Sequence, residues 1–143
     1  MTSDEIRAFI ERYIDLWERE DVSALVKCYA DDCVVKSPMF QTIQGRAAIE
    51  ASFRKLFLAF GDWAIELEDV VIDRGSDERA VLLYTAEVTH RGEIFGMPGN
   101  GRRVENTAAH FLRFENGLIA AERRMYDFTG FLVQLGVLKA RAV

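Results

Sequence analysis

The stretch RVENTAAHFLRFENGLIAAERRMYD, residues 103–127, decides the fold. Apolar and polar side chains alternate along it on both sides of Glu115-Asn116-Gly117. Alternation with a period of two is typical of a half-buried β-strand, and Asn-Gly between two such runs is typical of a tight hairpin turn. The stretch therefore predicts an antiparallel hairpin, with one strand over residues 103–114 and the next over 118–127.

Two more strands are predicted upstream of this hairpin, over residues 63–73 and 79–91. Both runs are rich in β-branched and aromatic residues, and Gly75-Ser76-Asp77 between them is typical of a turn. Four consecutive strands joined in this way indicate a meandering antiparallel sheet.

Three helices are predicted before the sheet. Thr2 and Glu5 form a capping box, and the apolar residues of the first helix then recur every three or four positions, at Ile6, Phe9, Ile10, Tyr13, Ile14 and Trp17. Asp21 is expected to cap a second helix, which includes Tyr29 and stops at a turn at Asp31-Asp32 before a short strand over 33–36. Gly45 is expected to open the third helix, which ends at Gly61.

This order of elements predicts a single α+β domain over residues 1–143. We expect a cone-shaped, curved antiparallel sheet closed by the three N-terminal helices and enclosing a hydrophobic pocket. A chain of 143 residues, half of them apolar, is long enough to build such a core without metal ions or disulfides.

Charge and composition exclude several classes of partner. The chain has 18 Lys and Arg against 23 Asp and Glu, whereas a nucleic-acid partner requires a basic surplus. No signal peptide or membrane span is predicted, so we expect a cytoplasmic protein. Cys28 and Cys33, together with only two histidines, lack the spacing of a metal site or a disulfide framework.

The alternation also predicts which strand residues face the pocket. In the strands over 79–91 and 103–114 the even-numbered residues are the more apolar, so they are predicted to face inward. In the last strand the odd-numbered residues are predicted to face inward, unless a bulge reverses the alternation. The residues then predicted to meet in the pocket, with two from the first helix, are Tyr13, Trp17, His90, Asn106, His110, Arg123, Met125 and Asp127. An inward Asp127 would hold His110 in its charged form and fix its tautomer.

Each of these side chains also has a structural interpretation. Asp127 is equally suited to cap a closing helix near Thr129, and buried histidines are more often structural than catalytic. Arg123 could instead lie at the rim or at a dimer interface. Tyr13 and Trp17 have the spacing of ordinary core residues.

With these residues in place, the chain resembles the nuclear transport factor 2-like superfamily, and within it the SnoaL-like polyketide cyclases and ester cyclases. The resemblance covers nearly the whole chain. The segments that carry it are residues 12–14, Trp17, Asp21, 29–35 and 45–49 in the first half, and 89–98, Gly101-Arg102, 116–119 and 127–136 in the second.

The resemblance implies an activity and an assembly. In these enzymes an aspartate near this point is the general acid/base of an aldol ring closure, which implies Asp127 as a catalytic residue. His110 corresponds to the second oxyanion donor of steroid isomerases, and Tyr13 to their oxyanion-hole tyrosine. The resemblance also implies a homodimer through the outer face of the sheet, where parity suggests contacts at Phe111, Leu118 and Tyr126.

We therefore expect a SnoaL-like enzyme that performs acid/base chemistry, an aldol-type cyclisation or an isomerisation, on a small hydrophobic carbonyl compound without a cofactor or metal. The first alternative is a binding or interaction module without catalysis. Steroid isomerisation is less favoured because Ser37 stands where those enzymes have their carboxylate base. Epoxide hydrolysis is also less favoured, because only Arg91 and Glu93 resemble that site and Arg124 replaces its second aspartate.

Overall fold

The fold is described from a computed structural model, in which residues 1–75 and 77–140 are placed well enough to describe. The elements, in chain order, are α1 (Ser3–Glu18), α2 (Val22–Val26), β1 (Tyr29–Ser37), β2 (Gln41–Gln44), α3 (Arg46–Ala59), β3 (Phe60–Asp73), β4 (Arg79–His90), β5 (Arg103–Glu115), β6 (Leu118–Tyr126) and α4 (Phe128–Leu135). Ser76, in the predicted turn between β3 and β4, lies outside the described residues.

The first helix begins as the sequence predicts. The Thr2 hydroxyl oxygen accepts a hydrogen bond from the Glu5 amide, the Glu5 carboxylate accepts one from the Thr2 amide, and α1 then buries its apolar face. The second helix is shorter than predicted: it ends at Val26, and Tyr29 begins β1. Tyr29 is fully buried, so packing in the core rather than helical spacing decides its conformation.

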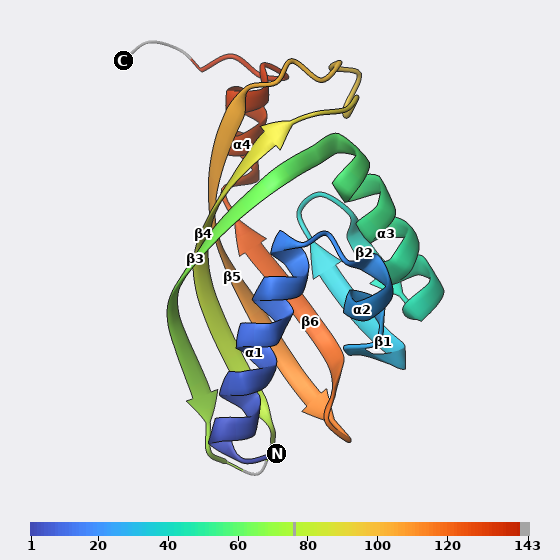
Figure 1. The fold of residues 1–143 in the computed structure, drawn as a ribbon, viewed down its shortest axis with the longest axis vertical. Helices are drawn as coiled ribbons and strands as arrows, with labels where there is room; N and C mark the ends of the chain where they lie inside the picture. The colour runs from blue at the N-terminus through green and yellow to red at the C-terminus, as the bar shows by residue number, and fades with distance from the viewer. Residues whose placement is uncertain (76, 141–143) are drawn as a thin grey trace.

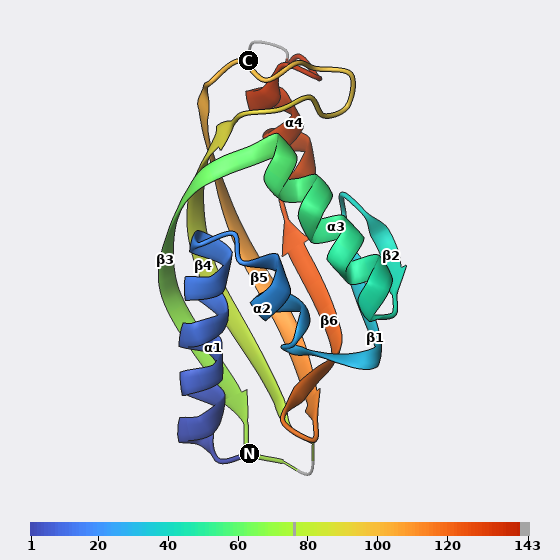
Figure 2. The same cartoon turned by 45° about the vertical axis from the view of Figure 1, so that its right-hand side comes forward.

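Six strands form one sheet in the order β2-β1-β6-β5-β4-β3. All neighbouring pairs are antiparallel except β1 and β6, which run parallel, and β2 is a strand that the sequence reading missed. The predicted hairpin between β5 and β6 is confirmed, with Asn116 and Gly117 both at positive φ in its turn. The sheet is curved and unclosed, and α1 and α3 lie on its concave side (Figures 1 and 2).

A bulge in β6 controls which side chains face the concave side. Arg113 and Phe114 are consecutive in β5, yet they pair with Ala121 and Ile119, so Ala120 is an extra residue in β6. A bulge exchanges the two faces of a strand from that point on. Glu122 and Arg124 are therefore buried, whereas Arg123 and Met125 are exposed.

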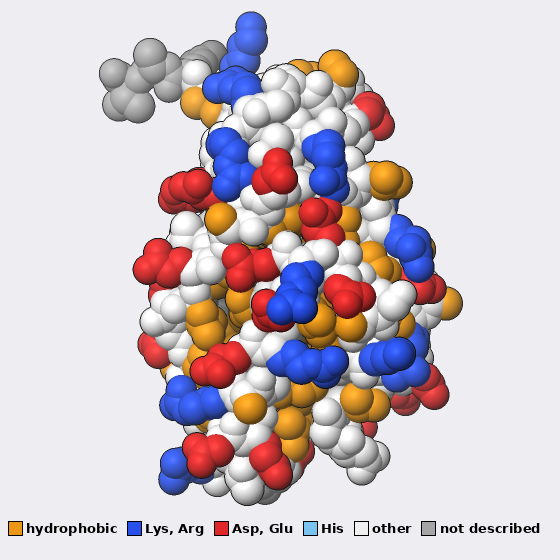
Figure 3. Space-filling view, viewed as in Figure 1, with side chains coloured by type: hydrophobic (Ala, Val, Ile, Leu, Met, Phe, Trp, Pro, Cys, Tyr) orange, Lys and Arg blue, Asp and Glu red, His pale blue; other side chains and the backbone are white. Residues whose placement is uncertain are grey.

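The surface on the helical side carries mixed charges. Figure 3 shows acidic and basic side chains interspersed among apolar ones on this face. Within the described ranges, no helix is both long and apolar enough to cross a membrane. The cytoplasmic location stays a prediction.

Candidate functional site

An inner pocket lies between the concave face of the sheet and the helices. Its volume is about 50 Å³, room for a few water molecules. Most of its wall is aromatic or aliphatic, and its residues are Trp17, Ser37, Met39, Phe40, Leu56, Phe60, Trp63, Tyr84, Ala86, Val88, Asn106, His110, Arg124, Tyr126 and Phe131. An apolar pocket with a few converging polar groups is the usual form of a small-molecule site.

A chain of buried hydrogen bonds runs from the pocket wall into the core. The hydroxyl of Tyr84 lies 2.8 Å from Nε2 of His110, and Nδ1 of His110 lies 2.9 Å from the hydroxyl of Tyr13. Tyr13 then donates to Oε1 of Glu122 at 2.7 Å, and Tyr29 donates to the same oxygen at 3.0 Å. These hydrogen bonds therefore connect Tyr84, at the pocket, to the Glu122 carboxylate behind it.

The chain of hydrogen bonds ends at a buried ion pair. Nε of Arg124 donates to Oε2 of Glu122 at 2.7 Å, and the Arg124 guanidinium also lies over the rings of Trp17 and Phe53. Burial alone would raise the pKa of Glu122, but the Arg124 charge, together with the bond from Tyr13, holds that pKa below its usual value. Glu122 is therefore a carboxylate at neutral pH.

His110 is neutral in this environment. Burial lowers its pKa to about 3, more than the nearby Glu122 charge raises it. Its Nδ1 lies 3.9 Å from Oε1 of Glu122, a contact that is not an ion pair because the imidazole carries no charge.

The positions of the protons in the chain follow from these charges. A carboxylate has no proton to give, so Tyr13 must donate to Glu122, and its oxygen then accepts from Nδ1 of His110. A neutral imidazole has one N–H, so Nε2 is an acceptor and Tyr84 must donate to it. The Tyr84 oxygen is left with only lone pairs to offer a ligand.

Three of the predicted site residues line the pocket: Trp17, Asn106 and His110. Tyr13 lies behind His110, in the hydrogen-bonded chain rather than at the pocket. His90 is fully buried against the ring of Phe60 and does not line the pocket, and neither of its ring nitrogens has a partner within the described residues.

The predicted inward direction of Arg123, Met125 and Asp127 is wrong, because the bulge at Ala120 shifts the alternation of β6. Arg123 and Met125 lie on the outer face. The exposed Asp127 is the N-cap of α4, and its carboxylate accepts from the amide of Gly130 at 2.9 Å. The predicted contact between Asp127 and His110 is replaced by the bonds of His110 to Tyr13 and Tyr84.

The residues of the epoxide hydrolase alternative lie outside the pocket. Arg91 binds Glu20 at 2.5 Å and the carbonyl of Phe57, which ties the end of β4 to the helices. Glu93 accepts from the Gly96 amide within the following loop. Both side chains therefore have structural partners.

Sequence reasoning missed Tyr84, Glu122 and Arg124. A usable signal was present for two of them: Glu122 and Arg124 are opposite charges two residues apart on one strand, so they can face inward together and neutralise each other. Among residues 1–75 and 77–140, no group of three His, Cys, Asp or Glu side chains could hold a metal ion.

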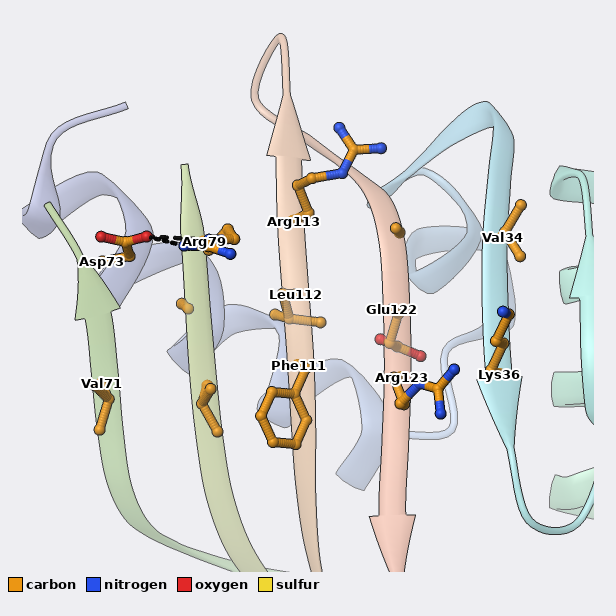
Figure 4. Close-up of a pocket in the computed structure, with 13 residues that line it drawn as sticks. Val34, Lys36, Val71, Asp73, Arg79, Phe111, Leu112, Arg113, Glu122 and Arg123 are labelled. Carbon is orange, nitrogen blue, oxygen red and sulfur yellow. Dashed lines mark hydrogen bonds and ion pairs between the residues drawn. The ribbon is translucent and has the colours of Figure 1, made fainter. Parts of the chain in front are cut away.

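A second, larger concavity of about 880 Å³ lies on the outer face of the sheet. Figure 4 shows Phe111 at its centre, Val71 on β3, and Arg123 beside Lys36. The three large apolar residues of this face are well exposed: Val71 by 60%, Phe111 by 48% and Met125 by 51%. Charged side chains, among them Asp73, Arg79 and Arg123, lie around these apolar residues, so the face has the mixed character of a surface that can contact another protein.

Comparisons with known proteins agree with this fold. A family model described as SnoaL-like polyketide cyclase matches residues 7–135. AclR, a proposed hydroxylase from Streptomyces galilaeus, is similar with a TM-score of 0.84 and 25% identity, over 99% of this chain and 87% of that one.

Two further structures are similar in fold. TsrD from Streptomyces laurentii has a TM-score of 0.81 and 24% identity, over 96% of this chain and 99% of that one. A proposed polyketide cyclase from Xanthomonas campestris pv. campestris has a TM-score of 0.79 and 17% identity, over 92% of this chain and 97% of that one.

Proposed function

The chain belongs to the SnoaL-like polyketide cyclase family, and we propose that it binds a small, mostly apolar carbonyl compound in the inner pocket and moves a proton on it without a cofactor. The observation that carries the proposal is the neutral His110, held by hydrogen bonds on both ring nitrogens between the pocket and a buried carboxylate. Fixed donors and acceptors in a desolvated pocket are well suited to proton transfer.

The proposed step is a relay that begins with the breaking of an O–H or an activated C–H bond of the ligand. The released proton passes to the Tyr84 oxygen while the Tyr84 proton moves to Nε2 of His110. The Nδ1 proton then moves to the Tyr13 oxygen, and the Tyr13 proton moves to Glu122. The bonding electron pair stays on the ligand as an alkoxide, phenolate or enolate.

Charge is conserved in this relay. The negative charge of Glu122 is replaced by one on the ligand oxygen, close to the Arg124 guanidinium that lines the same pocket. Because the pKa of Glu122 is held low, the protonated Glu122 readily returns the proton to the product, and the forward transfer depends on the Arg124 guanidinium stabilising the charge on the ligand oxygen. Such an enolate supports the aldol-type cyclisation or isomerisation expected from the sequence.

Ligand binding also requires that the pocket widen. Sites for drug-sized ligands measure roughly 300 Å³ or more, against about 50 Å³ in this closed form. Met39 and Phe40, half-buried in the turn between β1 and β2, line the pocket and are the side chains that we expect to move.

The test is native mass spectrometry of the protein against aromatic polyketides, ketosteroids and terpene epoxides, with each ligand also followed for a change of mass or isomer. We expect binding with conversion, and loss of the conversion in Tyr84→Phe, which removes the first member of the relay. Tyr126→Phe is the matched control, because Tyr126 lines the same pocket but stands outside the relay.

The same experiment decides between this relay and the competing assignment to Asp127. If Asp127→Asn abolishes conversion while Tyr84→Phe keeps it, the relay is wrong and the predicted catalytic aspartate is right. Binding without any conversion would instead favour a carrier or sensor, in which Asp127 only caps α4.

We also propose that two copies pair through the outer face. Lys36 and Arg123 are in register on β1 and β6, and neither makes an ion pair within the described residues. Exposed acidic residues lie on β3 to β5, toward the opposite edge of the sheet from β1. They include Glu66, Glu68, Glu87 and Glu105. A two-fold axis near Phe111 would set the basic edge of one copy against the acidic edge of the other.

Sedimentation tests this pairing. We expect a species of twice the 16.3 kDa chain mass, and a monomer for Phe111→Glu, because that variant would bury an unpaired charge in the interface. Leu58→Glu is the control, since Leu58 is 74% exposed on α3, away from the outer face. A 16.3 kDa species of the unmodified protein at micromolar concentration would contradict the pairing. Tyr126 is no longer a candidate contact, because it lines the inner pocket.

A further inference from the structure

The indole N–H of Trp17 is a buried donor without a partner. Trp17 lines the inner pocket and is 3% exposed, and its Nε1 makes no hydrogen bond within the described residues. Trp63 lines the same pocket, but its Nε1 donates to the carbonyl of Phe60 at 3.1 Å. Since buried N–H groups almost always have an acceptor, a group that enters the pocket is the natural partner of Trp17.

The Tyr84 hydroxyl, which lines the same pocket, is a free acceptor. The proton of Tyr84 is committed to Nε2 of His110, so the Tyr84 oxygen can only accept from a ligand. Both rings pack edge-on against His110, with centroids 6.0 Å away for Trp17 and 5.0 Å for Tyr84. One donor and one acceptor therefore flank the same imidazole in the pocket wall.

The positive charge of Arg124 also favours an acceptor oxygen beside the Trp17 indole. The Arg124 guanidinium lies 5.1 Å from the centre of the Trp17 ring, and a positive charge there favours an electron-rich oxygen beside the indole. Much of the remaining wall is apolar, with Leu56, Phe60 and Val88 among its members, and its other polar side chains are Ser37, Asn106, Arg124 and Tyr126.

We propose that the pocket selects ligands that carry both a carbonyl and a hydroxyl group, with the carbonyl oxygen accepting from the Trp17 indole and the hydroxyl donating to the Tyr84 oxygen. Phenolic ketones and enolised dicarbonyls have this pair of groups, and simple apolar ketones do not. The inference rests on the proposed function, because it names the functional groups of the ligand in the same pocket.

Three small probes of similar size separate the two contacts. Para-hydroxyacetophenone has both groups, acetophenone has only the carbonyl, and para-ethylphenol has only the hydroxyl. Calorimetric titrations should show that Trp17→Phe lowers the affinity for the two ketones about tenfold and leaves the affinity for para-ethylphenol unchanged. Tyr84→Phe should weaken the two phenols and leave acetophenone unchanged.

Trp63→Phe is the matched control. It makes the same substitution in the same pocket, at an indole whose N–H is already bonded to the protein. We expect it to change the affinities of the three probes by the same factor. A ketone-selective loss in this variant would show that ring size, not the free N–H, discriminates among the probes, and would overturn the proposal.

Proton–nitrogen NMR of the unmodified protein gives a second readout that needs no variant. The chain has two tryptophans, so two indole N–H signals report on Trp17 and Trp63. Either ketone should move the Trp17 signal downfield and the Trp63 signal much less. If the probes bind and the Trp17 signal stays in place, the proposal is wrong.

The failures of the two proposals are distinguishable. Equal affinity for all three probes, with no selective loss in Trp17→Phe, overturns only the proposed contacts of the ligand with Trp17 and Tyr84. Absence of binding by any probe up to its solubility limit counts against the inner pocket as a ligand site, and both proposals then fall.

Discussion

Replacing Glu122 with glutamine should destabilise the protein by about 3–5 kcal/mol, because it leaves a buried guanidinium without its counter-ion. The side chains of Glu122 and Arg124 are 0% and 5% exposed, and they are joined by a hydrogen bond of 2.7 Å. Water cannot take over the solvation of Arg124 at this depth. Since domains of this kind are stable by roughly 5–15 kcal/mol, the loss is a large share of the total.

Chemical denaturation of the unmodified protein and Glu122→Gln measures the difference directly. Glu115→Gln is the matched control, because Glu115 also binds an arginine at 2.6 Å but is 60% exposed, and exposed pairs contribute little. The double variant Glu122→Leu with Arg124→Met should recover part of the loss, since it leaves neither charge buried alone. A cost below about 1 kcal/mol for Glu122→Gln would mean that the pair is not buried as described.

The same pair explains where sequence reasoning succeeded and where it failed. A strand was predicted over residues 118–127 and β6 spans Leu118–Tyr126, but the choice of its inner face rested on hydrophobicity alone. Glu122 and Arg124 can compensate each other across two residues, whereas Arg123 and Asp127 are about 13 Å apart and cannot. The cost of burying unpaired charge therefore favours the observed face.

The elements with local signals were predicted closely. The capping box at Thr2, the Asn116-Gly117 turn and the alternation of β4 and β5 each depend on residues near in sequence, and the structure confirms them. The bulge at Ala120 and the parallel pairing of β1 with β6 depend on distant residues. His110 was identified from the alternation of its strand and from the resemblance, but its partners Tyr13 and Tyr84 are 97 and 26 residues away in the chain.

Stability should fall as the pH drops below about 6.5, and His110 should be the main cause. Its pKa is lowered to about 3 in the folded protein, whereas an unfolded histidine titrates near 6.5. Above pH 6.5 neither state binds the proton and the full stability is present. Below it the unfolded state gains a proton that the folded state excludes, so stability falls by about 1.4 kcal/mol per pH unit, or about 2 kcal/mol between pH 6.5 and 5.

The groups in contact with His110 do not titrate between pH 6.5 and 5, so they add nothing to the fall in stability over this range. Tyr13 and Tyr84 bind its two nitrogens, and burial raises the pKa of both hydroxyls, so neither titrates in this range. Glu122 and Arg124 keep their charges there, because the pKa of Glu122 lies below its usual value and that of Arg124 far above neutrality. His110→Gln keeps one donor and one acceptor for the two tyrosines, and it should remove most of the slope between pH 6.5 and 5.

Denaturation curves at several pH values, for the unmodified protein and His110→Gln, measure this slope. NMR of the folded protein adds a direct observation, since the His110 ring signals should keep their neutral positions down to pH 5. An inflection of these signals between pH 6 and 7 would mean a charged imidazole, with a proton on both nitrogens. Tyr84 would then accept from Nε2, its own proton would point to the ligand, and both the relay and the predicted preference for a ligand hydroxyl at Tyr84 would be wrong.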